Sequence, residues 1–127
     1  MRFLALLALL VVTSVARAED PAAASFPQFC DEWADKLAAR ERDNVAHIQW
    51  EAEDGVVKGD YLGYTREHTC LTKIGTQSTP VGKIIYREIK YEKVGSTVEE
   101  AEQTEARAVD VTEITEIFRY AGGKWLY

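Results

Sequence analysis

The sequence predicts an α+β fold in which one N-terminal helix packs on an antiparallel sheet of four to five strands. Two observations carry this prediction. Apolar residues recur at intervals of three and four over residues 26–37, and from residue 45 onward they recur at every second position. The change of period marks the passage from a helix to strands. Because a helix and a sheet each have one apolar face, we expect the two to cover each other.

The first eighteen residues have the pattern of a signal peptide. Arg2 provides the positive start, residues 3–12 are apolar, and Ala16-Arg17-Ala18 fits the cleavage pattern. The apolar run is shorter than the about 20 residues that span a bilayer, so we expect no membrane anchor. The sequence therefore predicts export to the periplasm or the outside of the cell.

The rest of the chain is predicted to be a short leader and one domain. Residues 19–25 are small and polar and include Pro21, which favours a flexible leader. Residues 26–127 have the length of a single α+β domain. Removing Arg2 and Arg17 from the 15 basic residues leaves a net charge of −8, because the chain has 21 acidic residues. This charge disfavours nucleic acid and anionic membrane surfaces and favours cationic partners.

The helix is expected to run from Pro27 to about Arg42. Ser25 is a suitable N-cap, and Pro27 is acceptable in a first turn. Its apolar face consists of Phe26, Phe29, Cys30, Trp33 and Leu37.

A β-hairpin is predicted around Asp54-Gly55, a pair typical of a type I′ turn. A two-residue loop there pairs Glu51 with Lys58, and Trp50 with Gly59 on the apolar face. We therefore expect Trp50 to contribute more to stability than Trp125, which lies near a chain end.

The remaining elements follow from turn residues and β-branched stretches. We expect a loop over residues 75–80, a strand over 82–94 and a solvated excursion or short helix over 97–107. If residues 97–107 begin with a short helix, Ser96 and Glu99 could form its capping box. A long strand over 108–120 changes its apolar phase, which indicates a β-bulge near Thr112 or Glu113. A turn at Gly122-Gly123 leads to a last strand over 124–127.

Cys30 and Cys70 are the two cysteines of the chain. An even number of cysteines in an exported protein predicts a structural disulfide. A redox pair is disfavoured, because such pairs usually lie close together as C-x-x-C.

The closing segment resembles a known superfamily. Residues 114–120 (ITEIFRY) followed by Gly122-Gly123-Lys124-Trp125 are similar to the final strand and turn of the cystatin-like and nuclear-transport-factor-like roll proteins. The resemblance implies that the sheet is curved and that the helix lies in its concave face. The central Q-x-V-x-G hairpin motif of cystatin inhibitors is not present, since the hairpin tip here reads Glu53-Asp54-Gly55.

Few residue patterns indicate chemistry. His68 and Cys70 could bind a metal together with His47 or Glu67, but the disulfide would occupy Cys70, so we expect no metal and no cofactor. The carboxyl groups of Glu88 and Asp110 are the ones best placed for partial burial. They could act as bases, or pair with basic neighbours such as Arg87 and Arg119.

The strand tyrosines are the strongest candidates for a binding surface, because tyrosine combines apolar area with a polar tip. The set consists of Tyr64, Tyr86, Tyr91 and Tyr120. The sequence therefore predicts an exported, non-enzymatic binding module for a protein partner or a small apolar ligand. An inhibitor of an exported or foreign hydrolase is the alternative, and a small roll-fold enzyme is a third.

Overall fold

The computed structural model describes residues 20–75 and 78–127, so the predicted signal peptide lies outside the described residues. The elements follow in the order α1 (Pro21–Ala46), β1 (Glu51–Glu53), β2 (Val56–Tyr64), β3 (Thr69–Lys73), β4 (Val81–Gly95), α2 (Val98–Gln103), β5 (Arg107–Ala121) and β6 (Lys124–Leu126).

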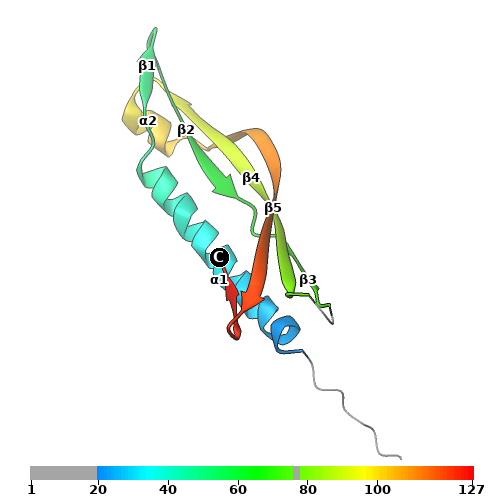
Figure 1. The fold of residues 1–127 in the computed structure, drawn as a ribbon. Coiled ribbons are helices and arrows are strands. Elements are labelled where there is room, and N and C mark those ends of the chain that lie inside the picture. The colour runs from blue at the N-terminus through cyan, green and yellow to red at the C-terminus, as the bar shows by residue number, and fades with distance from the viewer. Residues whose placement is uncertain (1–19, 76–77) are drawn as a thin grey trace, which may run out of the picture.

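The α+β prediction is confirmed. One antiparallel sheet has the strand order β1-β2-β4-β5-β6, and β3 pairs with β4 beside β2. The sheet is strongly curled, and α1 runs along its length (Figure 1). The β1–β2 hairpin and α2 lie near one end of α1, and β3 and β6 lie toward the other. Within the described ranges, no helix has the length and apolar character that a bilayer crossing requires.

Helix α1 begins earlier and ends later than predicted. Asp20, not Ser25, is the N-cap, and its side chain accepts a hydrogen bond from the Ala22 N–H at 2.8 Å. Pro21 occupies the first turn, where a missing N–H costs nothing. The prediction of a flexible leader is therefore wrong for residues 21–25, which are helical. Pro27 lies inside the helix and is exposed to solvent.

The core lies where the N-terminal half of α1 meets β4, β5 and β6. The predicted apolar face of α1 is confirmed, with Phe26, Phe29, Cys30 and Leu37 buried and Trp33 packed against them. The Phe26 ring lies so close to Gly82 of β4 that a side chain there would collide with it. Gly82 therefore sets the distance between helix and sheet.

Trp125 is part of this core, which corrects the expected ranking of the two tryptophans. Its ring packs 4.6 Å from that of Phe26, and its Nε1 donates a hydrogen bond to the Ala22 carbonyl at 3.1 Å. Trp125 is 6% exposed, whereas Trp50 is only half-buried over Gly59. The extended helix explains the difference, because its first turn covers the end of the chain.

The β1–β2 hairpin has the predicted turn and register. Asp54 and Gly55 have φ angles of 51° and 74°, as a type I′ turn requires, and Glu51 pairs with Lys58. Trp50 itself precedes β1, which begins at Glu51.

The long strands β4 and β5 match the predictions to within one residue at each end. The register between them shifts after Lys90, so that Val109 is the additional residue on β5. The predicted bulge is therefore present, but it lies three residues before Thr112. Helix α2 is capped by Thr97 instead of Ser96: the Thr97 side chain accepts a hydrogen bond from the Glu100 N–H at 3.1 Å.

Candidate functional site

The structure does not bring the four candidate tyrosines together on one exposed surface. Tyr86 is buried, and Tyr64 packs against it with ring centroids 6.0 Å apart. Tyr120 packs on Trp125 at 5.2 Å at the border of the same core. Tyr91 lies elsewhere, stacked on Tyr61 at 5.2 Å. Three of the four therefore contribute mainly to the core.

Tyr86 shows the consequence of burial most clearly. Its hydroxyl donates a hydrogen bond to the Glu116 Oε1 at 3.2 Å. Burial, followed by the nearby Glu116 carboxylate, raises the pKa of Tyr86 to about 12 from its ordinary value of 10.0. The neutral phenol is therefore part of the folded structure.

We expect the free energy of unfolding to fall as the pH rises from 10 to 12. In this range the unfolded chain releases the Tyr86 proton, whereas the folded chain retains it, so alkali favours unfolding. Denaturant unfolding at a series of pH values should show a smaller fall for Tyr86→Phe. An equal fall in the wild type and in Tyr86→Phe would mean that folding does not raise the pKa of Tyr86.

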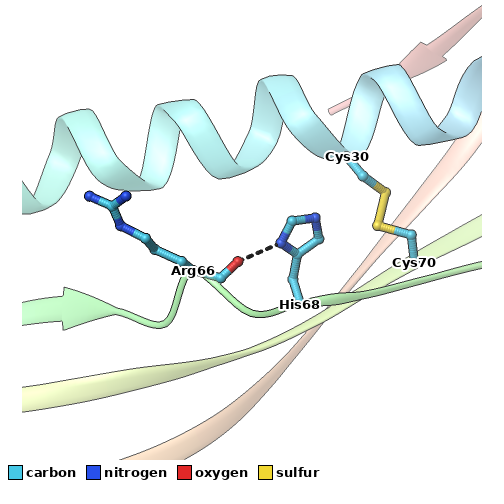
Figure 2. The surroundings of a disulfide bond; sticks show 4 residues. All are labelled: Cys30, Arg66, His68 and Cys70. Atoms are coloured by element: carbon cyan, nitrogen blue, oxygen red, sulfur yellow. Dashed lines mark hydrogen bonds between the residues drawn. A yellow bond between two sulfur atoms is a disulfide. The ribbon is translucent and has the colours of Figure 1, made fainter.

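The Cys30–Cys70 disulfide is confirmed and joins α1 to β3 (Figure 2), with Cα atoms 6.5 Å apart. His68 lies beside the bridge, and its Nδ1 is 2.8 Å from the Arg66 carbonyl oxygen. Cys70 is therefore not available as a metal ligand. His47 lies at the end of α1, 3.3 Å from the Asp43 carboxylate. Among the described residues, no three potential ligands gather as a metal site.

The two candidate bases lie on β4 and β5. Asp110 is exposed, and its carboxylate accepts a hydrogen bond from the Val111 N–H at 2.9 Å. Glu88 is half-buried and pairs across the sheet with Thr112. Within the described part of the chain, neither forms the ion pair with Arg87 or Arg119 that was the alternative.

A groove of about 490 Å³ runs between α1 and the β2–β3 loop. Apolar side chains such as Leu37 share its lining with four charged ones, Asp35, Glu41, Arg42 and Arg66. Sites for apolar molecules usually have an apolar lining with few polar groups. The groove is therefore a poor match for the small apolar ligand that was one predicted partner.

A different surface lies on the opposite side of the sheet from the core. Cys70, Ile84 and Phe118 face α1, so the residues that alternate with them face away. We call this surface the outer face. It consists of Thr69, Leu71 and Lys73 of β3, Val81, Lys83, Ile85 and Arg87 of β4, and Glu113, Thr115, Ile117 and Arg119 of β5.

One row of the outer face crosses all three strands. Leu71 pairs with Lys83, and Lys83 pairs with Ile117, so the three side chains lie next to one another. Leu71 is 51% exposed and Ile117 is 65% exposed. Two large aliphatic side chains, Leu71 and Ile117, therefore lie on either side of Lys83 and are exposed to solvent.

The charge of the outer face is opposite to that of the whole chain. It carries four cations, Lys73, Lys83, Arg87 and Arg119, and one carboxylate, Glu113. Within the described ranges none of these cations forms an ion pair. Like charges without partners repel one another, so an acidic surface placed here would be attracted.

The other half of the sheet provides a contrast. Where β2 pairs with β4, Lys90 lies 3.4 Å from Asp60, and on the next strand Arg107 lies 3.1 Å from Glu92. Lys58, Lys90 and Arg107 of this half therefore each have a carboxylate within 4.0 Å, unlike the four cations of the outer face in the described part of the chain.

A hollow of about 270 Å³ lies at one end of the outer face, where β2 gives way to β3. Its lining includes Thr65, His68, Thr69, Arg87 and Glu113.

Sequence reasoning missed the outer face, although a signal was present. Ile117 is out of phase with Ile114, Phe118 and Tyr120, which point to the core. An apolar residue that breaks the alternation of a strand faces solvent, and here it marks the exposed surface.

Comparison with known proteins identifies no relative. No protein-family description matches the chain, and neither a curated protein nor a solved structure matches it.

Proposed function

We propose that the protein is an exported, non-enzymatic binding module that holds a partner protein on its outer face. The observation that carries the proposal is the exposed row Leu71, Lys83 and Ile117 among cations that have no ion-pair partner in the described ranges. The matching partner has an acidic surface around an apolar centre. Such a surface would bury both aliphatic side chains and neutralise the lysines and arginines together.

The exposed apolar side chains and the cations of the outer face both favour a protein partner. Full burial of an Ile or Leu side chain contributes about 1.5–3 kcal/mol, and both are largely exposed here. The cations would steer an acidic partner to the face and raise its association rate. Export is supported by the N-terminal pattern and by the disulfide, which persists in oxidising compartments.

A matched pair of double variants tests the proposal. Lys83 and Ile117 are cross-strand neighbours on the outer face, and Lys90 and Leu62 are cross-strand neighbours on the other half of the sheet. Each pair contains one lysine and one exposed aliphatic residue. We expect Lys83→Glu/Ile117→Glu to abolish retention of a partner from the native exported fraction, and Lys90→Glu/Leu62→Glu to preserve it.

The two variants are first compared with the wild type by denaturant unfolding, so that loss of folding is recognised. A partner that is retained equally by both variants would contradict the proposed surface. Equal loss in both variants, with folding intact, would also contradict it.

A further inference from the structure

The strands β2 and β3 pair with the same edge of β4, but their other edges differ in what covers their backbone groups. β2 pairs with β1 over Val56–Lys58. Farther along β2, Asn44 of α1 donates a hydrogen bond from its Nδ2 to the Leu62 carbonyl at 2.9 Å, and the Tyr64 N–H donates one to the Glu41 Oε1 at 2.8 Å. Side chains of α1 thus occupy backbone groups that a neighbouring strand would otherwise use.

β3 has no such cover within the described part of the chain. Its backbone hydrogen bonds are those of the ladder with β4, and no side chain bonds to the backbone of Thr69–Lys73. Four of its five residues are exposed, and Cys70 is half-buried. An edge strand with unpaired N–H and C=O groups is a template for another strand.

The disulfide makes this edge a rigid template. Cys70 is fixed to Cys30, which is 1% exposed in the core. A strand that adds to β3 therefore does not have to order it first, which lowers the entropic cost of binding.

We infer that the partner binds by adding an extended segment to the free edge of β3, and that this segment presents acidic and apolar side chains toward the outer face. The inference rests on the proposed function and specifies its mode. Main-chain hydrogen bonds to β3 would supply affinity, and alternate side chains would supply specificity. The row Leu71, Lys83 and Ile117 would be extended by one apolar residue beside Leu71, and Lys73 would lie beside a carboxylate.

Charge argues for a foreign segment over a second copy of this chain. Two β3 strands paired with each other would bring two outer faces into one sheet, each with Lys73 at the junction and Lys83 one strand behind it. An acidic segment neutralises these lysines instead.

The probe for the test is a blocked peptide, Thr-Glu-Thr-Val-Thr-Glu-Thr, which as a strand presents Glu, Val and Glu on one face. It is titrated into the oxidised, isotope-labelled protein and followed by amide NMR and hydrogen exchange. We expect saturable shifts centred on Thr69–Lys73 and slowed exchange of alternate amides there. The same peptide with Lys for Glu, or with N-methyl groups on alternate amides, should not bind.

Variants and exchange data distinguish addition of a strand to β3 from docking on the outer face without strand pairing. Lys73→Glu should weaken peptide binding about tenfold, equivalent to about 1.4 kcal/mol, and Lys90→Glu should not. If the peptide shifts Lys83 and Ile117 while exchange in β3 is unchanged, strand addition is wrong and the outer-face proposal stands. Absence of binding, or self-association through β3 without peptide, would overturn the inference.

Discussion

Replacing Trp125 by alanine is expected to destabilise the protein by about 3–5 kcal/mol. The side chain is 6% exposed, packs on Phe26 and Tyr120, and donates its Nε1 hydrogen bond to the Ala22 carbonyl. The substitution therefore leaves a cavity and removes the link between the end of the sheet and the first turn of α1. Denaturant unfolding with a constant slope would measure the loss.

Trp50→Ala is the matched control, because it removes the same side chain at a site where the ring is only half-buried and covers Gly59. We expect a clearly smaller loss of stability for this variant. Equal losses, or a larger loss for Trp50→Ala, would show that the core is not centred where α1 meets β6.

Removing the disulfide is the second change with a large expected effect. Cys30 and Cys70 are separated by 40 residues, and a bridge over such a loop stabilises a fold by roughly 3 to 4 kcal/mol in the chain-entropy treatment. The double variant Cys30→Ala/Cys70→Ala should lose about this much in denaturant unfolding. The oxidised wild type should lose a similar amount on reduction.

The double variant and the reduced wild type should both retain the helical circular dichroism signal under native conditions, which would show that the fold survives without the bridge. A loss below about 1 kcal/mol would mean that the bridge adds little to the contacts of α1 with β3, and that β3 is held by its ladder with β4 alone.

Local sequence chemistry was sufficient for much of the fold. The hairpin at Asp54-Gly55 depends on two residues that tolerate positive φ, and its register follows directly from the turn. The apolar face of α1 and the long strands β4 and β5 follow from periodicity. These features depend on neighbours in the sequence, so they could be predicted.

The errors arose where distant residues decide the structure. Asp20 with Pro21 and Ser25 with Pro27 are two local signals for the start of α1, and the contact of Trp125 with the Ala22 carbonyl, which joins the two ends of the domain, favours the earlier one. The burial of Trp125 depends on the same contact. The strand β3 was not predicted, because its five residues become a strand by pairing with β4.

The candidate site was predicted least well, for the same physical reason. Tyrosines on strands are equally suited to a core and to a surface, and Tyr86 proved to be buried. Lys83 and Ile117 lie far apart in the sequence and become neighbours only in the register of β4 with β5. Net charge also does not reveal local charge, because the outer face is basic on an acidic chain.

The most direct test of the binding surface is a titration of the retained partner, once purified, against three proteins at two salt concentrations. These are the wild type, Lys83→Glu/Ile117→Glu and Lys90→Glu/Leu62→Glu. The account predicts that the outer-face variant binds at least about tenfold more weakly and depends less on salt. The control variant should bind like the wild type. Equal affinities for all three proteins would contradict the assignment of the outer face as the binding surface.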